Sequence, residues 1–293
     1  MENQDKKNII LGFLSGGLVA ALLLFVFIYE EPAAISAINS EGESKEKQSY
    51  PNSYYDVVLQ AKAAIVYKPH SDEVLFAKNK DVQLPLASIT KVMSAIVASE
   101  SLPKDIKISF AESVWKLGDL LNYTLMVSSN EAATVLASAA SALGYGGQQL
   151  SFINKMNIKA NELGLHQTYF IDEAGLDVSD TQSGAYGSVS DVARLFKYAL
   201  GNIPTSLEAT TISDTWFDAS GDSYPAINTN KAIGAIPGLI AGKTGYTDLA
   251  GGNLVIAYDA GLNDTTIIVV LGSTKEGRFI DVEKLVNATR QIK

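Results

Sequence analysis

Apolar positions recur along the chain with two different spacings. Short apolar runs at 63–67 and 73–77 flank a polar turn at 68–72, a pattern that predicts a β-hairpin. Glycine and aspartate turns separate three further strand-like runs late in the chain, at 238–243, 253–258 and 265–271. Strands are therefore expected at both ends of the chain.

The region between these strands has the spacing of helices. Val92, Met93, Ile96 and Val97 recur with helical periodicity after Pro85. Compatible stretches follow at 120–127, 132–143 and 192–200, and 280–292 predicts a closing amphipathic helix. We predict an α/β fold of the α+β type, in which one antiparallel sheet is built from N- and C-terminal strands around a mainly helical insertion.

The N-terminus carries a different signal. Residues 9–29 are apolar or small, Lys6 and Lys7 precede them, and two glutamates follow. This pattern predicts a transmembrane anchor with residues 1–8 in the cytoplasm, because about 20 apolar residues span a bilayer and positive charges stay inside. A cleaved signal peptide ending before Ala37 is the alternative. In both cases the rest of the chain is exported.

The sequence after the apolar run divides into two parts. Residues 30–52 are polar and charged, which is typical of a flexible linker. Residues 53–293 are long enough, and apolar enough, to form one folded domain with a substantial core.

Composition excludes several classes of function. The formal net charge is −9, so the chain lacks the excess of basic residues that binding to nucleic-acid phosphates requires. Nucleic-acid binding is therefore excluded. The chain has no cysteine, and its two histidines, His70 and His166, are far apart in sequence. Thiolate chemistry is therefore excluded, and we expect no metal site and no cofactor.

A serine followed three residues later by lysine occurs at four places, so this spacing is weak evidence alone. Ser44 lies in the linker, a proline soon follows Ser101, and Ser113 does not begin an apolar helix. Ser88 does begin such a helix, and the i, i+3 spacing puts Lys91 on its face. We therefore select Ser88 and Lys91.

This pair suits nucleophilic catalysis. A serine hydroxyl needs a base, and without a suitable histidine a neutral lysine can serve. The pKa of Lys91 must then be lowered, for which we expect burial and a neighbouring cation, Lys243. The alternative is a helix cap at Ser88 and a solvated lysine at Lys91.

Two further tripeptides each occur once. Ser128-Ser129-Asn130 lies between two predicted helices, where Ser128 could relay a proton and Asn130 could hold a substrate amide. A serine or asparagine that caps the following helix is the alternative.

Lys243-Thr244-Gly245 lies at the end of a predicted strand. A cation beside a hydroxyl can bind a terminal carboxylate, and Gly245 allows a peptide to approach the backbone closely. An ordinary strand end is the alternative.

Together, in this order, the three motifs are the signature set of class A β-lactamases and penicillin-binding proteins. The sequence resembles the serine D-Ala-D-Ala carboxypeptidases, the low-molecular-mass penicillin-binding proteins. The similar blocks are 86–93, 170–176, 190–195, 228–230 and 242–247. The resemblance implies a penicillin-binding-protein or β-lactamase-like fold.

The resemblance also implies an activity, the removal of the terminal D-alanine from peptidoglycan stem peptides outside the cell. β-Lactams would be covalent inhibitors. The implied roles are Ser88 as nucleophile, Lys91 as base, Ser128 and Asn130 as proton relay and amide anchor, Lys243 with Thr244 as carboxylate site, and the backbone N–H groups of Ser88 and Tyr246 as oxyanion hole.

Other activities stay open. A DD-endopeptidase that cuts cross-linked peptidoglycan uses the same motifs. A class A-like β-lactamase is disfavoured because no Glu-x-x-Leu-Asn segment follows Asn130. An inactive wall-binding scaffold is disfavoured because every motif side chain is present. Asp172 and Glu173 either position a deacylating water or form a solvated surface pair. Ala174 stands where many members of the family have His or Ser.

Overall fold

The computed structural model describes residues 50–143, 150–261 and 264–292, all within the compact unit Ser49–Lys293. No helix in this part of the chain is long and apolar enough to cross a membrane. The predicted anchor at 9–29 and most of the predicted linker lie outside the described residues.

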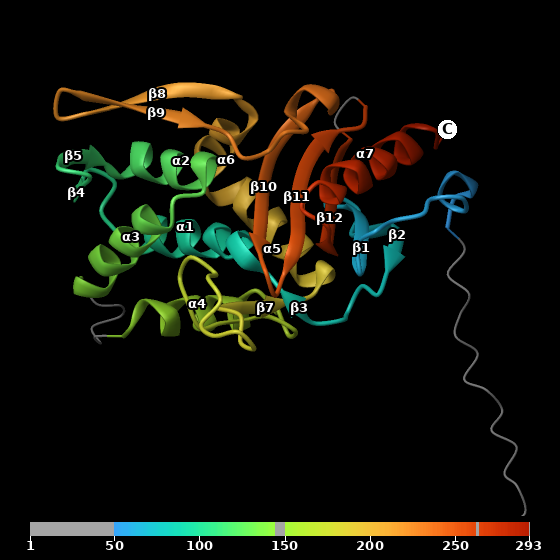
Figure 1. Cartoon of the computed structure of the whole chain (residues 1–293), viewed down its shortest axis with the longest axis horizontal. Coiled ribbons are helices and arrows are strands. Elements are labelled where there is room, and N and C mark those ends of the chain that lie inside the picture. Colours follow the sequence, from blue (N-terminus) through green and yellow to red (C-terminus); the bar gives the residue numbers. More distant parts are fainter. Residues whose placement is uncertain (1–49, 144–149, 262–263, 293) are drawn as a thin grey trace, which may run out of the picture. The chain divides into compact units, whose positions relative to one another are not determined.

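Five antiparallel strands form the main sheet, in the order β10-β11-β12-β1-β2. Their bounds are β1 Ala63–Lys68, β2 Glu73–Lys78, β10 Leu239–Thr247, β11 Gly251–Asp259 and β12 Thr265–Ser273. β1 pairs with β12, so strands from the two ends of the domain lie side by side (Figure 1). The predicted α+β sheet is confirmed.

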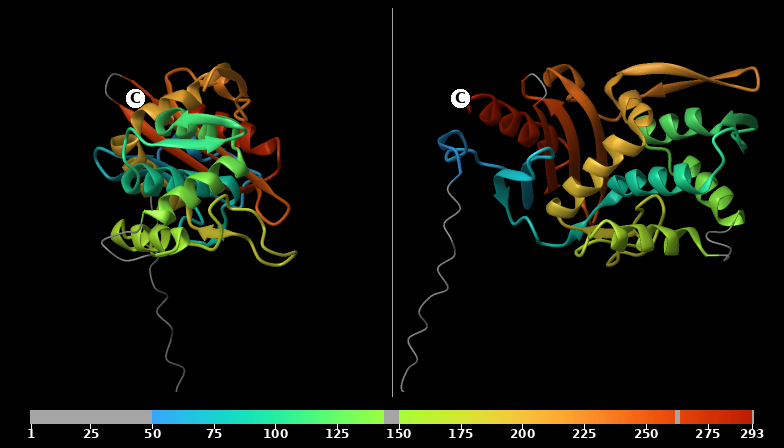
Figure 2. Two further views of the ribbon diagram at one scale, coloured as in Figure 1. Left: turned by 90° about the vertical axis from the view of Figure 1, so that its left-hand side faces the viewer. Right: turned by 180° about the vertical axis from the view of Figure 1, so that it is seen from behind.

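Helices cover both faces of this sheet. α7 (Gly277–Arg290) packs on β11 and β12, and α5 (Val189–Asn202) packs on β12 and β1 (Figures 1 and 2). Successive residues of β11 alternate between the two cores: Val255 faces the helical insertion, whereas Leu254 faces α7. This double burial explains why the strands are almost continuously apolar. α7 begins three residues before the predicted start of the closing helix.

The insertion between β2 and β10 is mainly helical, as predicted. Its helices are α1 Thr90–Ser101, α2 Leu117–Val127, α3 Asn130–Ala142, α4 Phe152–Glu162, α5 and α6 Pro204–Glu208. α1 is central: it contacts α2, α3, α4 and α5, and its residues from Thr90 to Ala98 are all buried. A helix buried on all sides holds the residues at its start firmly.

The insertion also contains short strands that the sequence analysis missed. They form the hairpins β4 Lys107–Phe110 with β5 Ser113–Lys116 and β8 Asp214–Ala219 with β9 Asp222–Ile227, and a small sheet of β3 Leu84–Pro85, β7 Ala185–Gly187 and β6 Tyr169–Phe170. The 3₁₀ turns are η1 Asn52–Tyr54, η2 Ala87–Ile89, η3 Ala209–Thr211 and η4 Ile233–Ala235. Runs of two to six residues carry too little periodicity to predict.

Asn253 connects the sheet to the start of the helical insertion. Its fully buried side chain donates to the carbonyl oxygens of Pro85 and Leu86, at 2.9 and 3.0 Å, and accepts from the Gly272 N–H at 2.8 Å. These three bonds satisfy backbone groups of two distant segments, so Asn253 fixes the turn before Ser88 against β11 and β12.

We expect Asn253→Ala to lower the free energy of unfolding by about 2–4 kcal/mol, because buried backbone groups lose their partner. Urea unfolding followed by circular dichroism measures this change. Asn202→Ala is the matched control, since the Asn202 side chain makes one exposed bond, to the Tyr198 carbonyl. Equal effects of the two substitutions would contradict a structural role for Asn253.

Candidate active site

Ser88 lies in the strained turn η2, directly before α1. The preceding residue, Ala87, has a φ of 49°, a left-handed conformation that is costly for a residue other than glycine. Two glycines press against this turn: a Cβ on Gly245 would lie 2.8 Å from the Leu86 oxygen, and one on Gly175 would lie 2.0 Å from the Ala87 oxygen. The turn is therefore clamped between β10 and the loop around Gly175.

Gly245 makes room for the protein's own turn, the one that carries Ser88. The expected close approach of a substrate peptide to Gly245 stays a prediction. Lys243-Thr244-Gly245 also lies within β10, which continues to Thr247, instead of at its end.

Lys91 is completely buried beside the serine. Its Nζ donates to Ser88 Oγ at 2.8 Å, to Asn130 Oδ1 at 2.6 Å and to the Ala174 carbonyl oxygen at 2.9 Å. An ammonium has three N–H donors, so every one is used. The structure thus joins the first two motifs, and it excludes the alternative of a solvated lysine.

Burial lowers the pKa of Lys91 to about 8, although the carboxylates of Asp172, Glu131 and Glu173 oppose this shift. An uncharged amine is favoured because the buried ammonium loses its hydration. At pH 7 about one Lys91 in ten is neutral. The residue can therefore act as a base near neutral pH.

In the loop between α2 and α3, one residue caps a helix and its two neighbours face the candidate site. Ser129 Oγ caps α3 by accepting from the Ala132 N–H at 3.1 Å. Ser128 has a left-handed φ of 62° and turns to the other side, where its Oγ accepts from Lys243 Nζ at 2.7 Å. Because Ser129 serves as the cap, Ser128 and Asn130 are left for the site.

Lys243 is also buried, and its Nζ donates to Ser128 and, at 2.9 Å, to the Thr244 carbonyl oxygen. Burial, then the charges of Lys91 and Arg278, hold the pKa of Lys243 well below its ordinary value. For Lys91 itself, burial is the cause of the lowered pKa, and the charged groups that act on it are the three carboxylates. The repulsion between the two lysines lowers the pKa of Lys243 instead.

Two further residues lie beside the third motif. Thr244 Oγ1 is 2.5 Å from Thr229 Oγ1, which places the segment 228–230 next to β10. Tyr246 is 43% exposed, and Lys275 Nζ lies 5.2 Å from the centre of its ring. The backbone of β10 passes directly beside Ser88, since a Cβ on Gly245 would lie 3.2 Å from the Ser88 nitrogen.

Sequence reasoning missed two contributors. Arg278, in the first turn of α7, is buried and donates from Nη1 to the Gly245 carbonyl oxygen at 2.6 Å. The Ala174 carbonyl oxygen accepts from Lys91. Neither left a usable signal, because Arg278 is 33 residues from Gly245 and the Ala174 contact involves only backbone.

Asp172 and Glu173 are neither wholly solvated nor paired with each other. Asp172 Oδ1 accepts from the N–H groups of Ala174 and Leu176, both at 2.9 Å, and so shapes the loop that contacts Lys91. Glu173 Oε1 accepts from the Thr134 hydroxyl at 2.6 Å. The role of Asp172 is structural, since its two bonds shape the loop that presents the Ala174 carbonyl to Lys91.

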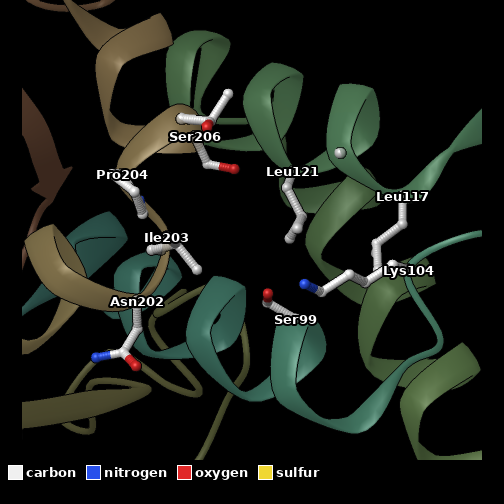
Figure 3. A pocket seen from close by; sticks show the side chains of 10 residues that line it. Ser99, Lys104, Leu117, Leu121, Asn202, Ile203, Pro204 and Ser206 are labelled. Carbon is white, nitrogen blue, oxygen red and sulfur yellow. The ribbon is translucent and has the colours of Figure 1, made fainter.

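A pocket of about 290 Å³ lies elsewhere, between the ends of α1 and α5 and the start of α2 (Figure 3). Lys104 and Ser99 point toward one another across it, opposite Asn202 and Ile203 (Figure 3). None of its lining residues belongs to the three motifs. The candidate site is thus defined by the hydrogen-bonded side chains around Ser88 and not by this pocket.

Comparison with known proteins agrees with this geometry. The family model described as D-alanyl-D-alanine carboxypeptidase matches residues 48–118 and 106–275. A D-alanyl-D-alanine carboxypeptidase of Bacillus subtilis is 30% identical over 79% of this chain and 62% of its own length, so this chain spans under two thirds of that relative. A D-alanyl-D-alanine endopeptidase of Haemophilus influenzae is 32% identical over 72% of this chain and 74% of its own.

Solved structures show the same fold. A penicillin-binding protein of Listeria monocytogenes in its ampicillin-bound form is 29% identical, with a TM-score of 0.69, over 80% of this chain and 98% of that one. Its cefotaxime-bound form gives a TM-score of 0.68 at 28% identity over the same shares. The chain belongs to the D-alanyl-D-alanine carboxypeptidase family, the low-molecular-mass penicillin-binding proteins.

Proposed function

We propose that this protein is a D-alanyl-D-alanine carboxypeptidase that removes the terminal D-alanine of peptidoglycan stem peptides through an acyl-enzyme on Ser88. The observation that carries the proposal is the buried amine of Lys91, 2.8 Å from Ser88 Oγ and with a lowered pKa. Family membership and the β-lactam-bound forms of the Listeria monocytogenes relative support it.

In acylation, neutral Lys91 accepts the proton of Ser88 Oγ as this oxygen attacks the carbonyl carbon of the penultimate D-alanine. The N–H groups of Ser88 and Tyr246 stabilise the oxyanion that forms. Asn130 Oδ1 keeps the Lys91 amine in place and its amide can hold the substrate backbone. The C–O bond is made before the C–N bond breaks.

The leaving amine needs a proton, which we assign to Ser128. Ser128 Oγ accepts from Lys243, so its own hydroxyl proton is free to be donated. The proton that Lys91 took from Ser88 then passes to Ser128, which restores the Ser128 hydroxyl and leaves Lys91 neutral. The terminal carboxylate binds Lys243 and Thr244, and its charge favours the ammonium form of Lys243. Water then hydrolyses the acyl-enzyme.

A DD-endopeptidase is the second candidate. The Haemophilus influenzae relative carries that name at an identity similar to the carboxypeptidases. The two activities share the acylation step and differ in the leaving group, a free D-alanine or a second stem peptide. Product analysis with a pentapeptide and a cross-linked dimer distinguishes them.

We further propose that residues 9–29 anchor the enzyme in the membrane as a single span, with residues 1–8 inside and the linker 30–52 holding the catalytic domain outside. The apolar run and its flanking charges support this placement. A wall substrate also requires the catalytic domain to lie outside the cytoplasm.

We predict that penicillin adds its mass once to the protein, at Ser88, because among the three Ser-x-x-Lys serines that the structure describes this one alone has a buried lysine at hydrogen-bond distance. Intact-mass measurement and peptide mapping locate the label. Ser88→Ala abolishes labelling, and Ser101→Ala, the control with the same spacing, retains it. A label on Ser88→Ala, or one mapped to Ser101 or Ser113, refutes the assignment.

The rate of acylation is expected to fall about tenfold per pH unit below pH 8, because protonated Lys91 cannot accept the serine proton. Stopped-flow measurement between pH 5.5 and 9.5, roughly spanning this pKa, tests it.

Lys243→Gln should lower kcat/KM on a pentapeptide by about tenfold to a hundredfold, through loss of a charge-assisted hydrogen bond, without moving the acid limb of the acylation rate.

Lys104→Gln, an exposed lysine away from the motifs, is the control for Lys243→Gln. A flat profile through pH 8 rules out Lys91 as the base. If the acid limb moves to higher pH in Lys243→Gln, repulsion from Lys243 does lower the pKa of Lys91.

For the anchor, we expect the protein to remain in the membrane fraction with an intact N-terminus. Fractionation followed by N-terminal sequencing provides the measurement. A soluble exported protein that starts near Ala37 would identify residues 9–29 as part of a cleaved signal peptide.

A further inference from the structure

One wall of the candidate site lies where the acyl part of a substrate leaves it. Under the proposed function, Lys243 and Thr244 hold the terminal carboxylate, and the scissile carbonyl lies at Ser88 and Tyr246. The rest of the peptide then passes Asn130, whose amide can hold the substrate backbone. The residues beside Asn130 therefore face the substrate residue that precedes the two D-alanines.

Two segments build this wall, the start of α3 and the loop after β6. Lys91 Nζ donates to Asn130 Oδ1 at 2.6 Å and to the Ala174 carbonyl oxygen at 2.9 Å. Glu131 directly follows the first of these partners, and Glu173 directly precedes the second. Burial lowers the pKa of Lys91, and both glutamates oppose this shift, so their carboxylates lie within electrostatic reach of the amine.

The two glutamates belong to the same rim. The Thr134 hydroxyl donates to Glu173 Oε1 at 2.6 Å and so joins the loop to α3 (Figure 1). Thr134 lies three residues after Glu131, on the same face of this helix. The Ser129 hydroxyl donates to Glu131 Oε2 at 3.1 Å. Within the part of the chain that the structure describes, neither glutamate forms an ion pair.

The charges around the site are divided between its two sides. The segments 128–142 and 168–187, from which the wall is built, contain five carboxylates and neither lysine nor arginine. The carboxylate site has the opposite character, because the buried cations Lys243 and Arg278 gather there. A substrate with a negative terminus and a positive charge in its acyl part is complementary to both sides.

Not every carboxylate of the wall is available to such a charge. Asp172 Oδ1 accepts from N–H groups of its own loop. Asp177 Oδ1 accepts from the Thr247 hydroxyl at 2.9 Å and ties the loop to the end of β10. Glu131 is exposed and Glu173 is half-buried. Hydroxyl groups are the side-chain donors to these two glutamates, and an ammonium group is a stronger donor to a carboxylate.

We infer that Glu131 and Glu173 select substrates in which the residue before the two D-alanines has a positively charged side chain, whose ammonium group they bind. The inference rests on the proposed function, which supplies the D-alanyl-D-alanine end. When Lys91 is neutral and acts as the base, the two carboxylates lose its charge, and the substrate ammonium replaces it. A helix-dipole role of Glu131 in the first turn of α3 would give no such preference.

Two peptides that differ only in this charge provide the test: acetyl-L-lysyl-D-alanyl-D-alanine with a free side-chain amine, and the same peptide with that amine acetylated. At about pH 9 the substrate amine is still protonated, whereas Lys91 is mostly neutral. We expect the wild-type kcat/KM to be about threefold to tenfold higher for the free amine at low ionic strength. The difference should shrink in about 0.5 M salt.

Glu131→Gln combined with Glu173→Gln removes both charges and keeps oxygens that accept from the hydroxyls. The ratio of the two kcat/KM values should fall to about one, through loss on the amine peptide. The acid limb of penicillin acylation should also move to lower pH, because the carboxylates raise the pKa of Lys91. Glu73→Gln combined with Glu208→Gln is the matched control, since both residues are exposed and lie outside the wall; it should retain the preference.

Equal kcat/KM of the two peptides in the wild type, with penicillin acylation intact, overturns the inference about the acyl side alone. A preference that survives in the double glutamine variant, or an equal loss on both peptides, also overturns it. Absence of penicillin acylation and of cleavage of either peptide in the wild type overturns the proposed function.

Discussion

The site depends on the burial of one amine. Lys91 has no access to water, and its three hydrogen-bond acceptors come from a turn, a loop and a backbone carbonyl that are far apart in the chain. The loss of hydration lowers its pKa to about 8, and its bonds to Ser88 and Asn130 give the amine a fixed position. An exposed lysine at the same spacing would have neither property.

Most of the surrounding structure keeps this amine buried and this turn in place. Asn253 ties the turn to the sheet, Gly245 lets β10 lie against it, and Arg278 fastens β10 from behind by donating to the Gly245 carbonyl. The strain at Ala87 persists because these contacts over-determine the turn. The sheet that joins β1 to β12 thus also supports the turn that carries Ser88.

The charged groups around the second buried lysine, Lys243, are cations, whereas those around Lys91 are carboxylates. Lys243 is under the influence of Lys91 and Arg278, so three cationic groups share one water-poor region. Such a region attracts an anion, because a bound carboxylate relieves the repulsion among the cations.

The sequence by itself determined the main strands and helices and identified Ser88, Lys91 and Lys243, because periodicity and short motifs are local properties. Only the tertiary structure decided that burial, and not a neighbouring cation, lowers the pKa of Lys91. It also revealed Asn253 and Arg278, whose partners are separated from them by 168 and 33 residues. Contacts over such separations leave no pattern within a window of sequence, and the exposure of a side chain depends on everything that packs around it.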